Sequence, residues 1–311
     1  MGEKYVEWRD ALTGVHPFIP LPDKYPPTLL NRLHRLILVP LLAIFRTPLI
    51  VLFLALLVTA DYLARKIASG PLKRATLRAT HFLLAGLVLW LFGFAVHKNT
   101  HLYKKQAPSI KSGHFILCNH VSYIEVLYMA YAYSPQFTSV TDSGLLIPVN
   151  LYQALFEIFW NRPVRSRETF KLSELVRRAK KNNDGPVLVF PEGTTTNGRI
   201  TISALPVVDI APSYYGTGHG IAIRYPNNGF SPSFCAGNVF KHTFFLSGQL
   251  RNTMELVYVP QDKVSNECAM SGASWLNEMW QLISDAACIS RGKITRDKKQ
   301  LFLKTYSRHI S

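Results

Sequence analysis

Two short segments of this chain contain residues that could perform chemistry. In the first, His120 stands five positions before Glu125, and the second, residues 190–194, reads Phe-Pro-Glu-Gly-Thr. Histidine titrates near neutral pH, so an imidazole oriented by a carboxylate is suited to remove a proton from a hydroxyl group. We therefore expect His120 to act as a general base, with Glu125 holding its tautomer and stabilising the imidazolium.

The first segment also has a structural interpretation. Ser122 and Glu125 have the spacing of a capping box, in which two side chains satisfy backbone groups at the start of a helix. A histidine in such a loop could then be structural too. The order in which several short segments follow one another along the chain favours catalysis more than any single segment does. In the catalytic interpretation, Ser122 still caps the helix and is not a nucleophile.

Short apolar runs that alternate with helical patterns surround the two segments. Strands are expected at residues 115–118, 137–140, 187–190, 221–223 and 254–259, and helices at 122–132 and 169–181. This alternation predicts an α/β fold with a mostly parallel mixed sheet and flanking helices. Because His120 follows one predicted strand and precedes a helix, we expect it at the carboxyl edge of the sheet, where such folds gather ligands.

A membrane-associated region is expected before the α/β pattern. Residues 1–35 are polar and lack the features of a cleavable signal peptide. Residues 36–100 contain two apolar runs joined by a basic loop, and the second run is shorter than the roughly 20 residues of a straight spanning helix. Basic residues flank both runs, which favours keeping all flanks cytosolic. We expect a helical hairpin or re-entrant segment here; two spanning helices or core helices are the alternatives.

Composition points to anionic partners for the chain. The net charge is +16, but no nucleic-acid-binding module is present in the sequence, so a membrane surface and anionic substrates are favoured over nucleic acid. The four cysteines are widely spaced, which predicts reduced thiols and no metal site. Residues 274–289 have the spacing of a packing helix. The basic residues 291–309 are expected to form a solvated helix face, with a membrane-surface role as the alternative.

Further segments agree with one protein family. The histidine and acid of the first segment, then Phe159-Trp160-Asn161-Arg162, then Phe-Pro-Glu-Gly-Thr resemble, in this order, the motifs of the glycerophospholipid acyltransferases. Glu125 stands where that family has aspartate, which keeps the charge and lengthens the reach by one methylene. Residues 3–18 are similar to the start of the fungal lysophosphatidic acid:oleoyl-CoA acyltransferases, and residues 224–227 and 250–260 resemble the lysophospholipid branch.

The resemblance implies a function and a location. It implies a glycerol-phosphate acyltransferase-like domain over residues 101–311 that esterifies the free hydroxyl of lysophosphatidic acid to give phosphatidic acid. Acyl-CoA would be the co-substrate, with no bound cofactor or metal. The location implied is the endoplasmic reticulum membrane and the lipid-droplet surface, facing the cytosol. The alternatives are another acceptor, such as lysophosphatidylcholine, and a weakly catalytic or non-catalytic lipid-binding protein on the same scaffold.

The resemblance also assigns substrate-binding residues. It places Glu192, Gly193 and Thr194 in the acceptor site and Arg162 on the acceptor phosphate, a group that the planar guanidinium binds well. Because a carboxylate repels phosphate, we expect Glu192 to bind glycerol hydroxyls or to orient Arg162. A surface cation is the alternative for Arg162. The apolar residues 145–160 are a candidate wall for the acyl chain, or else ordinary core.

Overall fold

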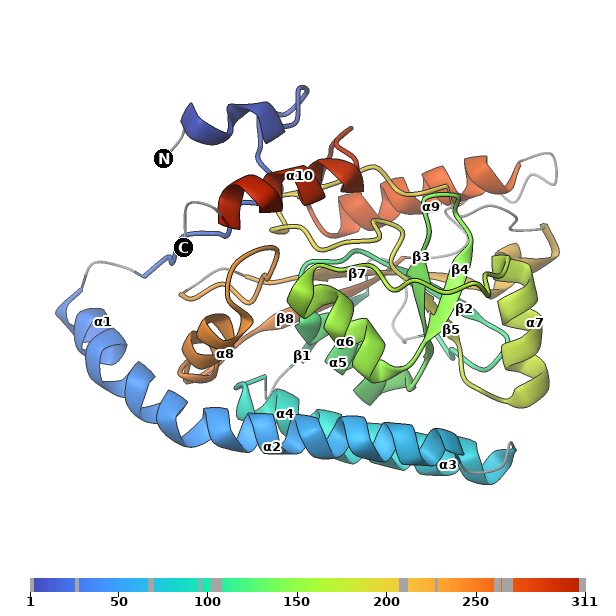
Figure 1. The fold of residues 1–311 in the computed structure, drawn as a ribbon, viewed down its shortest axis with the longest axis horizontal. Coiled ribbons are helices and arrows are strands. Elements are labelled where there is room, and N and C mark those ends of the chain that lie inside the picture. The colour runs from blue at the N-terminus through green and yellow to red at the C-terminus, as the bar shows by residue number, and fades with distance from the viewer. Residues whose placement is uncertain are drawn as a thin grey trace.

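A seven-stranded mixed sheet lies at the centre of the protein (Figure 1). The computed structural model describes residues 3–25, 28–66, 70–94, 97–101, 108–206, 212–226, 229–259, 264 and 271–307. In sheet order the strands are β1 (His97–His101), β8 (Met254–Val259), β7 (Gly218–Arg224), β2 (Phe115–Cys118), β5 (Val187–Val189), β3 (Gln136–Val140) and β4 (Leu146–Val149). The four middle strands, β7 to β3, are mutually parallel, whereas β8 and β4 run antiparallel to their inner neighbours.

The predicted α/β fold with a mixed sheet and flanking helices is confirmed, and all five predicted strands are present. The sheet was expected to be mostly parallel, and it is so only in part, because the outer strands run opposite to the middle ones. Strand β4 was missed. It is four residues long, contains Pro148 and continues almost directly into a helix, so its apolar run has no period of its own. A proline is tolerated there because β4 is an edge strand.

Strand β2 is buried on both faces, which explains why its sequence has no polar alternation. Phe115 and Leu117 pack on one side of the sheet, and Ile116 and Cys118 pack on the other. The first side is covered by α7 (Leu172–Asn182) and α9 (Gly272–Ala286). The second is covered by α4 (Gly86–Leu91), α5 (Tyr123–Tyr133) and α6 (Leu151–Trp160).

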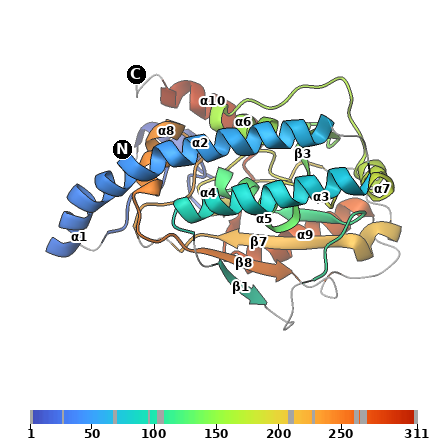
Figure 2. The same cartoon turned by 90° about the horizontal axis from the view of Figure 1, so that it is seen from below.

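The N-terminal region forms a helical hairpin under the sheet domain. Its elements are α1 (Leu29–Leu33), η2 (His34–Leu38), α2 (Val39–Lys66), α3 (Pro71–Thr80) and η3 (His81–Ala85), which continues into α4. Figure 2 shows α2 beside the α3–α4 run across the underside of the domain. Within the described residues, one continuous helix, residues 29–66, is long and apolar enough to cross a membrane.

The basic loop expected between the two apolar runs is largely helical. Pro71 starts α3, a position where its missing N–H costs nothing. The α3 arginines point inward and donate to the last carbonyls of α5: Arg74 to Tyr133 at 2.9 Å and Arg78 to Tyr131 at 2.9 Å. These cations therefore stabilise the C-terminal end of the helix that carries Glu125, as the helix dipole favours.

A buried polar cluster also joins the hairpin to α5. The two ring nitrogens of His81 lie 2.9 Å from the carboxylate of Asp61 and 2.8 Å from the hydroxyl of Ser134. This arrangement has the residue types of a catalytic triad, but all three side chains are at most 2% exposed. Its role is therefore to tie α2, η3 and the end of α5 together. The hairpin and the sheet domain also share one hydrophobic core.

The C-terminal elements complete the fold. They are α8 (Val239–Ser247), α9 and α10 (Arg296–Ser307). The smaller elements are the paired strands β6 (Ile200–Thr201) and β9 (Ser290–Arg291), the short helix η4 (Pro212–Thr217) and, at the N-terminus, the short helix η1 (Glu3–Trp8). The predicted packing helix α9 is confirmed, with Trp275 and Trp280 in the core. Residues 291–309 were expected to form a solvated helix face, but only one side of α10 is exposed to solvent. Its other side buries Phe302 against Trp8 and Phe18.

Candidate active site

Three neighbouring strands bring the candidate residues to one edge of the sheet. Strands β5, β2 and β7 are adjacent and parallel, so their carboxyl ends lie together. Glu192 follows β5, His120 follows β2 and Tyr225 follows β7. The structure therefore brings the two sequence-predicted segments together, and it adds a tyrosine for which no role was expected.

His120 and Glu125 form a direct pair. The Nδ1 atom of His120 lies 2.9 Å from Oε2 of Glu125, which sits in the first turn of α5 and is fully buried. Because a carboxylate can only accept, Nδ1 carries the hydrogen and Nε2 is left as an acceptor. The Tyr225 hydroxyl donates to the other oxygen of Glu125 at 3.1 Å. Glu125 thus makes contact with both the imidazole and the tyrosine.

The surroundings of His120 restrict both its ring and its backbone. The imidazole stacks on Phe190, with ring centroids 4.0 Å apart and an interplanar angle of 14°. Its backbone N–H donates to Oε2 of Glu192 at 2.7 Å, and its carbonyl accepts from Thr196 at 2.9 Å. The ring is thereby held in one orientation, at the wall of a small cavity.

The helix-capping interpretation is correct for Ser122 and incomplete for Glu125. The Ser122 hydroxyl accepts from the Ile124 N–H at 3.3 Å and donates to the Pro232 carbonyl at 2.6 Å, so it is the N-cap of α5. Glu125 does not close the expected capping box. Its Oε2 accepts from the Val121 N–H at 2.8 Å and from His120 as well. One carboxylate therefore both fixes the loop and orients the imidazole.

Glu192 lies behind His120. Its two oxygens accept from the backbone N–H groups of His120 and Ile202, at 2.7 and 3.2 Å, and burial raises its pKa to about 8. Within the described residues these oxygens do not bond to Arg162, although an orienting contact was one of the two expected roles. The side chain acts on the site by holding the His120 loop.

The Phe-Pro-Glu-Gly-Thr turn is closely fitted to its surroundings. Gly193 has φ of +59°, and a Cβ atom there would lie 2.6 Å from Leu205 Cδ1 and 2.9 Å from Arg296 Nη1. The positive φ therefore favours glycine, and a larger residue would also have to displace the ends of the Leu205 and Arg296 side chains. Gly193 and Thr194 line the same cavity as His120.

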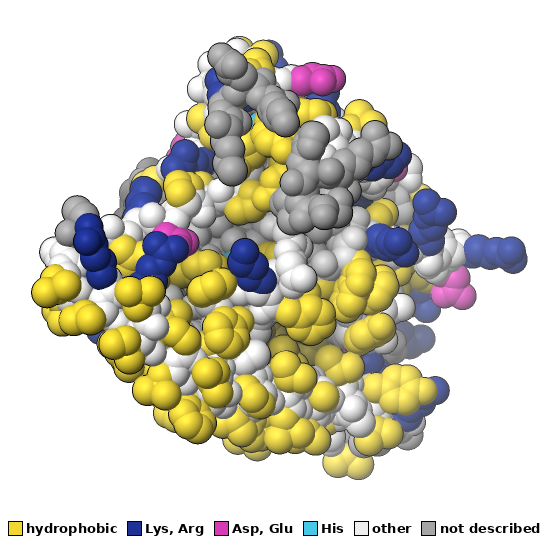
Figure 3. All heavy atoms as spheres, turned by 60° about the vertical axis from the view of Figure 1, so that its left-hand side comes forward, with side chains coloured by type: hydrophobic (Ala, Val, Ile, Leu, Met, Phe, Trp, Pro, Cys, Tyr) yellow, Lys and Arg dark blue, Asp and Glu magenta, His cyan; other side chains and the backbone are white. Residues whose placement is uncertain are grey.

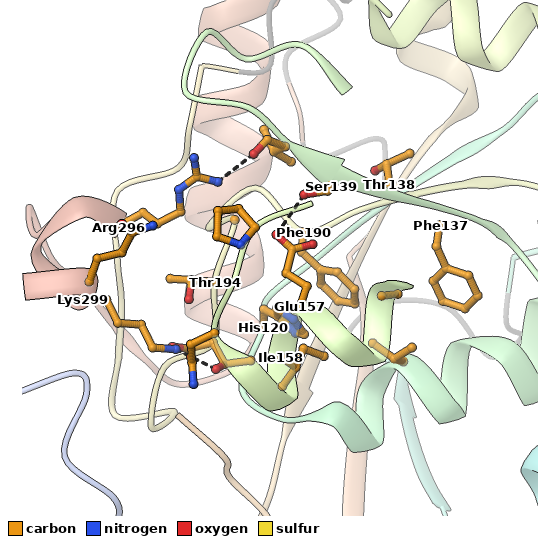
Figure 4. Close-up of a pocket in the computed structure, with 18 of the residues that line it drawn as sticks. His120, Phe137, Thr138, Ser139, Glu157, Ile158, Phe190, Thr194, Arg296 and Lys299 are labelled. Carbon is orange, nitrogen blue, oxygen red and sulfur yellow. Dashed lines mark hydrogen bonds between the residues drawn. The ribbon is translucent and has the colours of Figure 1, made fainter. Parts of the chain in front are cut away.

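The cavity beside His120 encloses about 50 Å³. His120, Thr194, Arg296 and Lys299 lie around it (Figure 4). Glu157 of α6 also lines it, accepting from the Ser139 hydroxyl at 2.9 Å, and burial raises the Glu157 pKa to about 7. Arg296 and Lys299 come from α10, so the C-terminal helix completes this wall, which the sequence did not predict.

A larger groove of about 1350 Å³ adjoins the cavity. Four residues line both spaces: Asn161, Pro163, Gln300 and Leu303. Arg162 is exposed and lines the groove beside the aromatic face of α6, formed by Tyr152, Phe156 and Trp160. The candidate acyl wall at residues 145–160 is therefore divided: Leu151 and Leu155 belong to the core, whereas the aromatic residues face the groove.

Among the described residues, no three or more His, Cys, Asp or Glu side chains are grouped so that they could hold a metal ion. Cys118, Cys235 and Cys288 are free thiols. Two residues of the family-like segments, Asn227 and Pro260, and the fourth cysteine, Cys268, lie outside the part of the chain that the structure describes.

Comparison with known proteins agrees with this geometry. Residues 93–224 match the family model described as Acyltransferase, a range that holds His120, Glu125, Arg162 and the Phe-Pro-Glu-Gly-Thr turn. This part of the chain is therefore similar to the acyltransferase family. Tyr225 and α10 lie beyond the matched range.

The relatives are lysophospholipid acyltransferases at modest identity. The chain is 28% identical over 227 residues to lysophospholipid acyltransferase LPEAT2 of Arabidopsis thaliana, covering 68% of this chain and 40% of the relative. It is 28% identical over 211 residues to a Schizosaccharomyces pombe protein provisionally named lysophosphatidic acid:oleoyl-CoA acyltransferase, covering 67% of this chain and 69% of the relative. It is 22% identical over 202 residues to human lysophosphatidylcholine acyltransferase 1, covering 64% of this chain and 37% of the relative.

The match extends over half or less of the two Arabidopsis relatives, LPEAT2 and LPEAT1, at 40% and 50% of their lengths. No solved structure matches this chain.

Proposed function

We propose that the protein is an acyl-CoA-dependent O-acyltransferase that esterifies the free hydroxyl of a lysophospholipid. The observation that carries this proposal is the contact of 2.9 Å between His120 Nδ1 and Glu125, at the wall of a cavity that adjoins a large groove. The acyltransferase-family match and the names of the relatives support the same reaction class.

The mechanism follows from the atoms present. Nε2 of His120 takes the proton of the acceptor hydroxyl as its oxygen attacks the thioester carbonyl of acyl-CoA. The tetrahedral intermediate then collapses, the carbon–sulfur bond breaks, and the proton passes from His120 to the departing thiolate. Glu125 remains ionised and stabilises the imidazolium between these steps. The scheme needs no covalent acyl-enzyme and no metal.

We propose lysophosphatidic acid as the acceptor, giving phosphatidic acid. The fission-yeast relative carries that substrate in its name, and two cations line the cavity beside His120. Lysophosphatidylcholine is the second candidate because the human relative is named for it. The direct contact of Glu125 with His120 argues against a purely lipid-binding protein.

The proposed function is tested by incubating the purified chain with labelled oleoyl-CoA and a panel of lysophospholipids. We expect labelled phosphatidic acid to form faster than the other products. Preferred labelling of phosphatidylcholine would move the assignment to the second acceptor. If no labelled phospholipid forms with any acceptor, while a known acyltransferase is active in the same vesicles, the proposed function is wrong.

A substitution of Arg162 distinguishes binding of the acceptor from binding of acyl-CoA. If it binds the acceptor phosphate, Arg162→Lys should raise the KM for lysophosphatidic acid by roughly tenfold or more, because a bidentate fork is replaced by a point charge. The KM for oleoyl-CoA should change much less. Arg167→Lys is the matched control, because Arg167 is an exposed arginine of the same segment. A rise in the KM for oleoyl-CoA alone would assign Arg162 to the phosphates of coenzyme A instead.

Tyr225 positions Glu125. We expect Tyr225→Phe to lower kcat by roughly tenfold, because a hydrogen bond to a charged group contributes about 1.5 to 3 kcal/mol. The two KM values should stay nearly constant, since Tyr225 is not among the residues that line the His120 cavity. Tyr62→Phe, at an exposed position of α2, controls for the loss of a hydroxyl. An unchanged kcat would show that His120 and the Val121 N–H hold the carboxylate without the tyrosine.

Membrane association belongs to the same proposal, with the endoplasmic reticulum and lipid droplets as the expected locations and the site facing the cytosol. Helix α2 buries Ala43, Ile50 and Leu57 against the domain and leaves its other side apolar and exposed. Figure 3 shows hydrophobic side chains over the lower part of the molecule, where α1 and α2 lie, and Lys and Arg side chains above them. Such a face suits an anionic bilayer surface.

We expect the double substitution Leu52→Glu and Leu56→Glu to reduce binding of the full chain to anionic vesicles by roughly 10²-fold, because burying one leucine contributes about 1.5 to 3 kcal/mol. Vesicle flotation measures the bound fraction. Leu301→Glu is the control, since Leu301 is 56% exposed on α10 at the opposite side of the molecule. Equal loss of binding in the control would contradict docking through α2.

A further inference from the structure

Two cations of α10 are buried in the wall of the catalytic cavity. Arg296 is 7% exposed and Lys299 is 1% exposed. They are three residues apart, so they lie on the same face of the helix. In Figure 4 both side chains reach the cavity near Thr194. Lysine and arginine are seldom buried to this degree unless a partner compensates their charge.

The partners of Lys299 are neutral. Its Nζ donates to the carbonyl of Thr195 at 2.7 Å and to the Thr195 hydroxyl at 2.9 Å. Those two bonds use two of the three N–H groups of an ammonium, and neither acceptor carries a charge. Burial lowers the pKa of Lys299 to about 8, and the charges of Cys235 and Glu192, which act in the opposite direction, do not offset this effect. The charge of Lys299 is therefore left for a further acceptor.

Arg296 forms its ion pair at its outer end, and the charge of the nearby Glu157 also acts on it. It pairs with Asp142, whose side chain is 75% exposed, and its Nη1 donates to the Val140 carbonyl at 2.7 Å. The buried Nε of Arg296 has no hydrogen-bond partner, which is costly for a guanidinium. Of the two other acids near the cavity, Glu157 bonds to Ser139 and Glu192 bonds to backbone N–H groups.

We propose that Arg296 and Lys299 form an anion subsite that binds the phosphate of the lysophospholipid acceptor, an inference that rests on the proposed acyl transfer. In lysophosphatidic acid the phosphate is separated from the reacting hydroxyl by only two carbons and an ester oxygen. When that hydroxyl meets His120, the phosphate must lie in or beside the same small cavity. In coenzyme A the long pantetheine arm separates the thioester from every phosphate, so those phosphates belong farther out, in the groove.

The surrounding residues fit this role. Gly193 lets Arg296 approach the turn after β5, where any side chain would collide with the guanidinium. Asn161 and Pro163, on either side of Arg162, line both the cavity and the groove. Arg162 can therefore approach the same phosphate from the mouth while the α10 cations bind it inside. The subsite also explains why a C-terminal helix is packed against the catalytic loop.

The test compares Lys299→Met with Lys298→Met in the full chain. Lys298 is exposed and neighbours Lys299 on α10, so the control removes the same charge outside the cavity. We expect Lys299→Met to raise the KM for lysophosphatidic acid by roughly tenfold or more, as loss of a charge-assisted bond predicts. The KM for oleoyl-CoA should remain within about twofold, and Lys298→Met should match the unsubstituted protein. Lys299→Arg, which retains the cation, should restore part of the acceptor affinity.

A second measurement does not depend on acyl transfer. Glycerol 3-phosphate should raise the thermal unfolding midpoint of the unsubstituted protein and of Lys298→Met, but not that of Lys299→Met. It also shows whether Lys299→Met is folded. If the unsubstituted protein transfers no acyl group, the proposed function fails, while this measurement still tests the subsite.

Three results would overturn the proposal. One is a KM increase for oleoyl-CoA alone, which would place a phosphate of coenzyme A at Lys299. Another is a loss of kcat with both KM values unchanged, which would make Lys299 a positioning residue. The third is protection by glycerol 3-phosphate that is equal in Lys299→Met and Lys298→Met.

Discussion

Replacing His120 with alanine is expected to lower the turnover number for acyl transfer by roughly 10²- to 10⁴-fold, the range typical for loss of a general base. The hydroxyl of the acceptor is a poor nucleophile until its proton is removed, and His120 has the only imidazole among the residues that line the described cavity. The turnover number is measured with oleoyl-CoA and lysophosphatidic acid, both at saturation.

Two controls accompany this variant. Vesicle binding should be unchanged, because the exposed apolar side of α2 does not include the catalytic loop. The thermal midpoint should change little, since the backbone bonds of residue 120 to Glu192 and Thr196 do not need the imidazole. A His120→Ala protein that transfers acyl groups at the original rate would rule out the proposed mechanism.

Local sequence signals were sufficient to predict the centre of the fold and the pairing of His120 with Glu125. The strands β2, β5 and β8 are short, largely apolar runs near proline or polar residues. Adjacent parallel strands such as β2 and β5 necessarily bring their following loops together. The separation of His120 and Glu125 allows one residue in the loop and one in the first helical turn to meet.

Contacts between distant segments were not predictable in this way. Tyr225 reaches Glu125 only because β7 pairs with β2. The sequences of the two strands do not indicate that they are neighbours in the sheet. The sequence also could not show that both oxygens of Glu192 are taken by backbone N–H groups, since those groups belong to two different loops.

The cations of α10 left a signal that could have been used. Arg296 and Lys299 precede Phe302 at intervals of three residues, so they lie on the same side of the helix as an aromatic residue of the core. A basic helix with a solvated polar face would place its cations opposite that stripe. Charged residues on the apolar stripe of a helix are therefore candidates for buried, functional cations.

Glu125→Gln separates catalysis from helix capping. Glu125 accepts hydrogen bonds from His120 Nδ1, the Val121 N–H and the Tyr225 hydroxyl. Glutamine can keep the first two through its carbonyl oxygen, and its amide group can donate to Tyr225, whose hydroxyl rotates to accept. The geometry of the loop is therefore largely retained, whereas the negative charge that stabilises the imidazolium is lost.

We therefore expect Glu125→Gln to lower kcat by roughly 10²-fold or more with little change in either KM, since loss of the carboxylate acts on the charged transition state rather than on substrate binding. Glu125→Asp is the matched control, because it keeps the charge and restores the family's residue with a shorter reach. It should retain much more turnover than Glu125→Gln. If Glu125→Gln keeps full turnover, the carboxylate only caps α5 and His120 works without an acidic partner. If both variants lose turnover equally, the reach of the side chain matters more than its charge, and the extra methylene of Glu125 is what this active site requires.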